Sequence, residues 1–350
     1  MQMTMTRAEA LLMRRTRSVD QPLLALIIVL AAAGFVMMGS ASMDYAAEQY
    51  GNPFYHIIRH GIYLALGAGA LYVVLQLPVR LWESAGPVLL VIGMAILALL
   101  LVPGIGREVN GATRWIGFGP FNLQPSELMK LFFVVYLAGY MTRRQRELQG
   151  SWSGMLKPLG LLGAVVALLL LEPDFGAAVV IAGASMAMLF LGGARLLPFI
   201  VLLAGALIGA GIMAVWSPYR MQRLITFLDP WSDQFSSGYQ LTQALIAFGR
   251  GEVLGVGLGN SVQKLFYLPE AHTDFVFAII AEELGLLGGV AFIALFGALI
   301  ARILWIGRTA ARRQQLFPAH VCFGIALLLA AQVFINIGVN AGLLPTKGLT

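Results

Sequence analysis

Four ionisable residues whose side chains could perform acid–base chemistry lie close together in the sequence. Glu270, His272 and Asp274 fall within five residues, and Lys264 lies just upstream. A long apolar stretch follows, so Asp274 is expected at the mouth of a helix that can cross a bilayer. An ionisable group there is costly to desolvate, and such a cluster can bind a charged group or move a proton. The alternative is structural, because Thr273 or Asp274 could cap the free N–H groups of that helix.

The composition indicates an integral membrane protein. Of the 350 residues, 59% are hydrophobic and only 11% are charged, against about 25% charged in soluble domains. Apolar runs of this length must be helical in lipid, because a helix satisfies its own backbone hydrogen bonds. We therefore expect an all-α polytopic helical bundle that forms one domain over residues 1–350. Its nine expected spans are 22–40, 56–76, 86–103, 124–141, 158–172, 175–192, 196–216, 275–300 and 318–340.

The distribution of basic residues predicts how the chain is oriented. Fourteen lysines and arginines lie in the N-terminal segment and in alternate loops, whereas the opposite loops hold seven over a greater length. Because basic loops stay in the cytoplasm, residues 1–21 are expected to be cytoplasmic. The loop 104–123 and the large loop 217–273 then lie on the periplasmic side. The positive charge is spread over many loops and gives no concentrated footprint for nucleic acid.

The large loop 217–273 is expected to be partly ordered, because it carries aromatic and aliphatic side chains that need burial. Helical spacing over 239–248 predicts a short surface helix with Leu241, Ala244, Leu245 and Phe248 on one face. The glycine-rich stretch 249–259 is expected to be a flexible turn back toward the bundle. Its glycines could allow close packing or hinge motion, or could cradle a phosphate. The phosphate interpretation is the weaker one, because no strand precedes the stretch.

Several further charged residues fall on the same predicted side of the membrane. Glu127 and Lys130 stand one turn apart at the start of the fourth span and could simply neutralise each other. Asp174 could be only the N-cap of the sixth span. Convergence on one leaflet is nevertheless what a lipid substrate with a charged head group would require. The converging residues are Arg114, Glu127, Lys130, Asp174, Lys264 and Asp274.

At these residues the chain resembles the SEDS family of cell-wall polymerases (shape, elongation, division and sporulation), most closely its cell-division branch. The matching motifs extend over nearly the whole chain, in which nine of the ten spans usual for the family are expected. They are Gly39–Ser42, Gly111–Trp115, Gln124–Glu127, Pro173–Gly176, Gly238–Gly251, Gly257–Lys264, Tyr267–Phe275 and Gly342–Thr350. The resemblance implies a peptidoglycan glycosyltransferase that polymerises lipid II at the outer face of the bacterial inner membrane, at the division septum.

The resemblance also implies a role for each candidate residue. Asp274 matches the family's catalytic aspartate and would take the proton from the 4-hydroxyl of the acceptor sugar. Cations would stabilise the pyrophosphate leaving group, and a divalent metal ion, Mg²⁺ or Mn²⁺, could share that task, with Asp174 and Asp274 as speculative ligands. The donor linkage is α and the product linkage β, so a single inversion suffices. The substrate-binding residues would be Arg114, Lys130, Lys264, His272, Glu270, Glu127 and Arg220.

The implied partners are lipid II, a class B penicillin-binding protein (an FtsI-type transpeptidase) and division proteins of the FtsQ, FtsL, FtsB and FtsN type, with no nucleic acid. Two other functions remain open. A lipid II flippase would also have many spans, but it would need a charge pathway through the membrane midplane, and the span centres here are apolar in sequence. A non-catalytic scaffold for division proteins would need Asp274 only for folding.

Overall fold

The computed structural model describes residues 19–109, 112–119, 121–215 and 226–345. Within these ranges a helix forms at each of the predicted apolar stretches, and three short helical elements lie between them. The long helices are α2 (Gln21–Tyr50), α3 (Tyr55–Gln76), α4 (Val79–Leu100), α5 (Pro125–Arg143), α7 (Trp152–Leu171), α8 (Phe175–Leu191), α9 (Leu196–Val215), α12 (Val276–Arg312) and α13 (Leu316–Asn340). The short elements are α6 (Gln145–Gly150), α11 (Tyr239–Gly251) and a π-type turn, η1 (Gln263–Tyr267).

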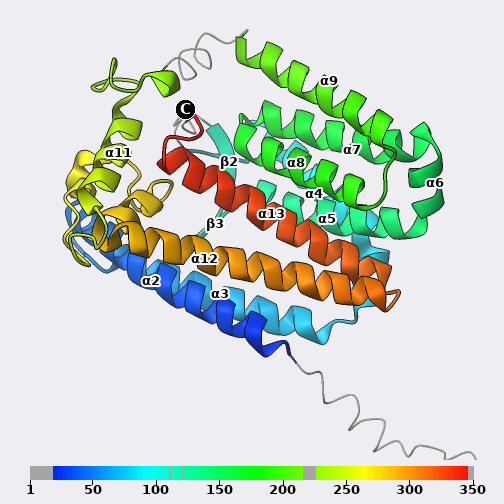
Figure 1. Ribbon diagram of the computed structural model, residues 1–350, viewed down its shortest axis with the longest axis horizontal. Coiled ribbons are helices and arrows are strands. Elements are labelled where there is room, and N and C mark those ends of the chain that lie inside the picture. Colours follow the sequence, from blue (N-terminus) through cyan, green and yellow to red (C-terminus); the bar gives the residue numbers. More distant parts are fainter. Residues whose placement is uncertain (1–18, 110–111, 120, 216–225, 346–350) are drawn as a thin grey trace, which may run out of the picture.

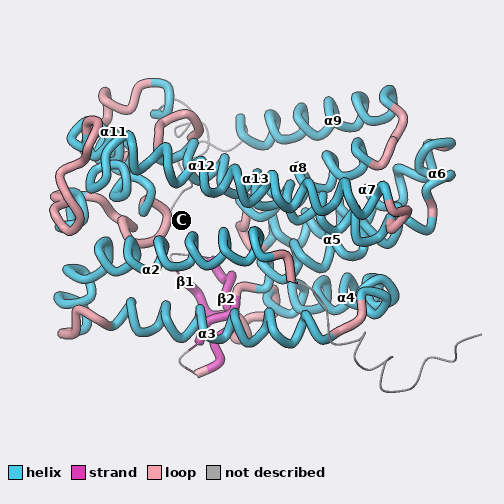
Figure 2. The backbone as a smooth tube through the Cα atoms, turned by 60° about the horizontal axis from the view of Figure 1, so that its bottom comes forward, coloured by secondary structure: helices cyan, strands magenta, loops and turns pink. Residues whose placement is uncertain are grey.

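Six of the described helices are long and apolar enough to cross a membrane, namely α2, α3, α4, α7, α12 and α13. Helix α8 is apolar but shorter, with 17 residues. The protein is therefore a multi-pass helical membrane protein. The helices lie side by side with alternating directions, so that α11 marks one end of the bundle and α6 the opposite end (Figures 1 and 2). We call these the α11 end and the α6 end.

Helices α12 and α13 form the centre of the bundle. Helix α12 packs against α2, α11 and α13, and α13 packs in turn against α5 and α8. One core cluster joins α4, α5, α7, α8 and α13 around the fully buried Phe133, Leu137 and Ile181. A second cluster joins α2, α11, α12 and the segment before α12, and it buries Leu268 and Phe275. This second cluster holds the segment that carries Asp274.

A small antiparallel sheet occupies most of the loop 104–123, in a protein that the sequence predicted to be all-α. Its strands are β1 (Arg107–Val109), β2 (Ala112–Phe118) and β3 (Phe121–Leu123), in the order β1-β2-β3. Figure 2 shows the sheet beside the helices near α3. Strand β2 contacts α4 and α5, and hydrogen bonding between strands satisfies backbone groups that a bare loop would expose. The all-α prediction is corrected to that extent.

Several helices extend beyond their predicted ends because polar residues continue them outside the apolar run. Helix α2 runs to Tyr50, ten residues past the predicted end at 40, and its extension buries Ser42 and Ala46. Helix α12 runs to Arg312 instead of 300. At the α6 end, Asp20 caps α2 by accepting a hydrogen bond from the Leu23 N–H (2.9 Å). The same carboxylate accepts two hydrogen bonds from Arg302 of α12, at 3.0 and 2.8 Å.

The surface helix predicted over 239–248 is confirmed as α11, with Leu241 and Ala244 buried. The prediction of a flexible turn after α11 is wrong, because this segment is hydrogen-bonded to a break in α12. The break lies at Gly285, whose φ of 67° and ψ of −166° are not helical. Four backbone hydrogen bonds of 2.9–3.2 Å join the broken turn to residues 252–257. They are Val256 N–H to Glu282 O, Gly257 N–H to Glu283 O, Leu286 N–H to Glu252 O and Leu287 N–H to Val253 O.

Glycine is required where these two backbones meet. A Cβ at Gly255 would overlap the Glu283 carbonyl, and Gly255 also has a φ of 81°. A Cβ at Gly285 would overlap the backbone of Val253 and Gly255. Of the interpretations of stretch 249–259, the structure therefore supports close packing.

Candidate functional site

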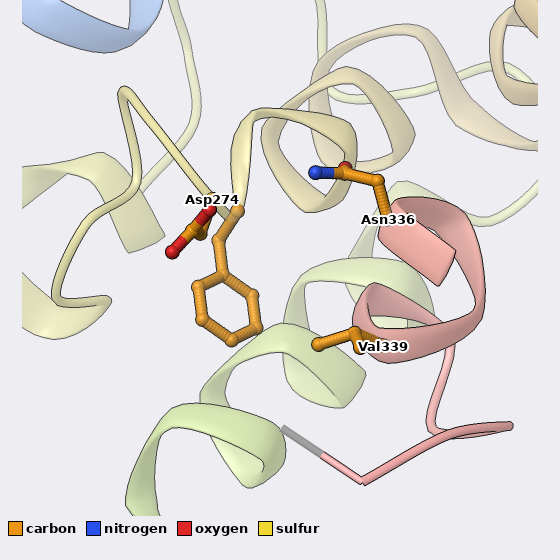
Figure 3. A pocket seen from close by; sticks show the side chains of 4 residues that line it. Asp274, Asn336 and Val339 are labelled. Atoms are coloured by element: carbon orange, nitrogen blue, oxygen red, sulfur yellow. The ribbon is translucent and has the colours of Figure 1, made fainter. Parts of the chain in front are cut away.

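Asp274 lies on the segment that enters α12, next to a small pocket against the end of α13. The pocket is lined by Asp274, Phe275, Asn336 and Val339, and Figure 3 shows the side chains of α13 facing the entry to α12. The Asp274 side chain is half-buried. No described residue donates a hydrogen bond to its carboxylate or forms an ion pair with it. A carboxylate in this state is free to accept a proton from a ligand.

The structure does not support the capping role that Thr273 or Asp274 could have had. The N-cap residue of α12 is Phe275, and no side chain of the entering segment caps the helix. The cap comes instead from α13, where the fully buried Asn340 accepts a hydrogen bond from the Ala278 N–H (3.0 Å). The Asn340 amide also donates to the Asp274 carbonyl oxygen (2.8 Å). Asn340 therefore fixes the backbone that carries Asp274 and leaves the carboxylate unengaged.

Glu270 shapes the turn before Asp274. Its φ of 57° is unusual for a residue with a side chain, and its carbonyl oxygen accepts hydrogen bonds from the N–H groups of Thr273 and Phe275, both at 3.1 Å. The Thr273 hydroxyl donates to the Glu270 carboxylate. The strained backbone is held by these contacts, and strain of this kind is concentrated at functional sites.

His272 stacks in a cluster of rings instead of pointing freely into solvent. Its ring centroid lies 4.6 Å from that of Tyr45 on α2 and 4.9 Å from that of His56 on α3. Burial lowers the pKa of His272 below its usual value, and the nearby Glu270 carboxylate partly opposes that shift. His272 is therefore expected to be neutral at pH 7. The ring contacts join His272 of the segment before α12 to α2 and α3.

Lys264 is placed differently from a free substrate-binding cation. Its side chain is 6% exposed, and its ammonium lies 3.0 Å from the Glu283 carboxylate of α12. It also donates to the Gly259 carbonyl oxygen (2.8 Å) and the Ser40 hydroxyl (3.2 Å). An ammonium group has three N–H donors, and these three contacts use them all.

A second group of predicted residues meets where α7 ends and α8 begins. Arg114 of β2 donates hydrogen bonds to the carbonyl oxygens of Glu172 (3.4 Å) and Pro173. The buried Asp174 is the N-cap of α8, accepting from the Ala177 N–H at 3.1 Å, which confirms its capping role. Asp174 also accepts from Ser126 (2.8 Å) and Gln124 (3.1 Å), at the start of α5. Among the described residues, no hydrogen bond or ion pair joins this group to the Asp274 carboxylate.

Glu127 and Lys130 form the ion pair that their spacing predicted, with the Lys130 ammonium 2.8 Å from the Glu127 carboxylate. The Lys130 side chain is 6% exposed and that of Glu127 is 54% exposed, so the carboxylate is the accessible partner. Arg220, a predicted substrate-binding residue, lies outside the described residues, as do residues 1–18 of the predicted cytoplasmic segment.

Asp174 and Asp274, the two speculative metal ligands, differ in how many carboxylate lone pairs are free to bind an ion. Three of the four lone pairs of the Asp174 carboxylate accept hydrogen bonds from the protein, so Asp174 fits a structural role better than a metal site. Asp274 has both carboxylate oxygens free of described partners. In the part of the chain that the structure describes, no three His, Cys, Asp or Glu side chains converge on one point. Mg²⁺ needs only one or two carboxylates when substrate phosphates complete its shell, and Asp274 fits that requirement.

Glu172 is a strongly perturbed carboxyl group at the end of α7. It is 3% exposed, and its Oε1 has no hydrogen-bond partner among the described residues. Burial, reinforced by the Asp174 charge, raises the pKa of Glu172 to about 8, although Arg114 opposes the shift. The folded protein therefore holds a protonated Glu172 at neutral pH.

We expect Glu172→Gln to stabilise the protein, and to do so more at pH 8 than at pH 5. The unfolded carboxyl ionises near its ordinary pKa of 4.5 and the folded one near a pKa of about 8. Wild-type stability is therefore lost as pH rises from about 4.5 to 8, whereas glutamine does not ionise. Thermal unfolding in detergent should show a gain on the order of 4 kcal/mol at about pH 8 and little gain at about pH 5. An equal effect at both pH values, or the same gain from the exposed control Glu48→Gln, would contradict this explanation.

Three buried polar residues near Asp274 were missed by the sequence interpretation. That interpretation places Asn340 at the end of an apolar span and gives it no role. It also treats the interior of the span 275–300 as apolar, yet Glu282 and Glu283, both 0% exposed, lie two turns into α12. Two adjacent carboxylates in a membrane helix are themselves a signal, because an ionisable residue at that depth needs a partner.

A family model described as "cell cycle protein" (FtsW, RodA and SpoVE) matches residues 21–350. The "Probable peptidoglycan glycosyltransferase FtsW" of Pseudomonas fluorescens is 55% identical over 331 residues, which are 95% of this chain and 81% of that protein.

Two solved structures have the same fold over nearly all of the chain. One, from work on "structural coordination of polymerization and crosslinking by a peptidoglycan synthase complex", has a TM-score of 0.75 and 32% identity, covering 95% of this chain and 90% of that one. The other, the rod shape determining protein RodA of Thermus thermophilus, has a TM-score of 0.68 and 28% identity, covering 96% and 89%. The chain belongs to the FtsW/RodA/SpoVE family of cell cycle proteins.

Proposed function

We propose that this protein is a peptidoglycan glycosyltransferase of the cell-division branch, which polymerises lipid II into glycan strands. The observation that carries the proposal is the Asp274 carboxylate, half-buried at the mouth of α12 and free of described partners. High identity to proteins named for this activity supports the reaction class. The apolar helices around the site suit a substrate that is held in the bilayer by a long prenyl chain.

In the proposed reaction, Asp274 acts as a general base on the acceptor lipid II. It removes the proton of the 4-hydroxyl as that oxygen attacks the anomeric carbon of the donor sugar. The bond from this carbon to the pyrophosphate oxygen breaks, and undecaprenyl pyrophosphate leaves with the bonding electrons. One displacement inverts the α linkage to β, so one carboxylate suffices and a covalent enzyme intermediate is not needed.

The other predicted substrate-binding residues, apart from Lys264, are proposed to bind and orient the charged head group. Arg114 and Lys130 are the described cations among them, and Arg220 is expected on the same side of the membrane. Glu127, Glu270 and the neutral His272 would accept or share hydrogen bonds with the sugars and peptide. Asp274 is the described residue that would hold a divalent cation, and the bound cation would supply positive charge to stabilise the leaving group.

We further propose that the α11 end of the bundle faces the periplasm in the inner membrane, at the division septum. The basic residues of the α6 end, including Arg143, Arg144 and Arg146, support a cytoplasmic position for that end. The proposed partner is a class B penicillin-binding protein, with proteins of the FtsQ, FtsL, FtsB and FtsN type beside it. The fold similarity to a complex in which polymerization and crosslinking are coordinated supports a transpeptidase partner.

The function is tested by reconstituting the purified protein with its transpeptidase partner in liposomes that contain lipid II. We expect glycan strands to form, as detected by gel electrophoresis, in amounts that depend on this chain. Transfer of lipid II between leaflets, read by a fluorescent head group, should not depend on it. If lipid II were transferred between leaflets but no polymer formed, the flippase function would replace this proposal. If a well-folded complex showed neither activity, the non-catalytic scaffold would be the remaining function.

A further inference from the structure

The two glutamates of α12 have binding partners that come from distant parts of the chain. Glu283 accepts hydrogen bonds from the Ser40 hydroxyl of α2, at 2.7 Å to each carboxylate oxygen, and from the Lys264 ammonium at 3.0 Å. Ser40 and Glu283 are 243 residues apart in the sequence. The same carboxylate thus connects α2, α12 and the start of the segment that leads to Asp274.

Glu282 binds the residues just before Lys264. Its carboxylate accepts from the Ser261 hydroxyl, from the Val262 N–H at 3.1 Å and from the Gln263 N–H at 3.3 Å. Its outer neighbour is Arg250 of α11, at 3.7 Å. Backbone N–H groups at the start of a helical turn favour an anion, so Glu282 fixes η1 in place.

The segment 265–275 is consequently anchored at both ends. Lys264 and the two glutamates hold its beginning, and Asn340 holds its end through the Asp274 carbonyl oxygen. Between the anchors, Leu268 and Ala271 are buried, and the Leu268 N–H donates to the Gln263 carbonyl oxygen (2.9 Å). Because no described group holds the Asp274 carboxylate itself, its position is set by this anchored backbone.

We propose that Lys264 is a positioning residue for Asp274, acting through its buried ion pair with Glu283 instead of touching the substrate. This inference rests on the function proposed above. The three donors of the Lys264 ammonium are already engaged by Glu283, Ser40 and Gly259, which leaves none for a pyrophosphate oxygen. Removing one partner leaves a buried charge unpaired, whereas removing both leaves no such charge. This difference separates a positioning pair from a substrate-binding lysine.

The test compares Lys264→Met, Glu283→Gln and the double variant in lipid II polymerisation with the transpeptidase partner. We expect each single variant to lower kcat by about 10- to 100-fold, because a displaced catalytic group costs rate. The KM for lipid II should stay within about twofold. The double variant should recover most of the lost kcat. A rise in KM for Lys264→Met that Glu283→Gln does not reverse would overturn the proposal and make Lys264 a substrate ligand.

A second measurement uses only the wild-type protein, so its result does not depend on whether a variant folds. The native protein is treated with an amine-reactive reagent, with and without lipid II, and modification is read by mass spectrometry. Lys157, with its side chain 55% exposed, is the internal reference. We expect Lys264 to react far more slowly than Lys157, whether or not lipid II is present. Reaction of Lys264 as fast as Lys157, with protection by lipid II, would overturn the proposal.

These results remain interpretable if the proposed function fails. Wild-type protein and Asp274→Asn are assayed in parallel, and absence of polymer from the wild type would reject the glycosyltransferase itself. The labelling result would still report whether the Lys264–Glu283 pair is buried. Polymer from the wild type, together with no recovery in the double variant, would reject only the positioning role.

Discussion

Replacing Asp274 by asparagine is expected to lower the rate of glycan polymerisation by about 100- to 10,000-fold, the usual contribution of a general base. Asparagine has nearly the same shape but cannot accept the proton of the acceptor hydroxyl. The backbone should be unaffected, because its hydrogen bonds with Asn340 and Glu270 use main-chain atoms of residues 273–275 and not the Asp274 carboxylate. The rate is measured as lipid II consumed per minute by the purified protein with its transpeptidase partner.

The matched control is Asp229→Asn, which makes the same chemical change at an exposed aspartate of the described outer segment. This variant should polymerise at the wild-type rate. Both proteins should unfold at the wild-type temperature, which shows that a lost rate is not a lost fold. Equal rates for Asp274→Asn and wild type would remove Asp274 from the chemistry.

Replacing Gly285 by alanine is expected to destabilise the protein by about 3 kcal/mol or more, because the backbone occupies a region that is essentially restricted to glycine. Its φ is 67° and its ψ is −166°. The added Cβ would also overlap the backbone of Val253 and Gly255. The hydrogen bonds between the break in α12 and the glycine-rich segment 249–259 should be lost. The rate of glycan polymerisation should therefore fall together with the thermal unfolding temperature.

The control in the same helix is Gly297→Ala. Gly297 is exposed and helical, and a Cβ there would meet no atom within 4 Å. Alanine has a higher helix propensity than glycine, so this variant should be as stable as the wild type or slightly more stable. If the two variants had the same stability, the contact between the break and the glycine-rich segment would not contribute to folding.

The parts of the fold that follow from one-dimensional patterns could be predicted. Each apolar stretch became a helix, because lipid leaves uniformly apolar backbone no other way to satisfy its hydrogen bonds. The N-cap role of Asp174 and the Glu127–Lys130 pair were also predictable, because both are local contacts. The helix ends were less predictable, as α2 shows, since tertiary packing of Ser42 and Ala46 continues the helix beyond its apolar core.

The candidate site was predictable in its residues but not in its connections. Asp274 and its neighbours stood out because charged groups are rare next to a membrane span. The partner of Lys264 could not be deduced, since Glu283 and Ser40 come close only after α2 and α12 have packed together. Asn340 was hidden for the same reason, lying 66 residues from the Asp274 carbonyl that it binds.

The role of Asp274 as the base of a single displacement can be tested with a donor that cannot act as acceptor. Such a donor is lipid II with its 4-hydroxyl blocked, mixed with the wild-type protein and its transpeptidase partner. We expect no release of undecaprenyl pyrophosphate until unblocked lipid II is added, and then one release for each bond formed. A burst of release, one per protein molecule, from the blocked donor alone would mean a covalent glycosyl-enzyme and would contradict the single-displacement mechanism.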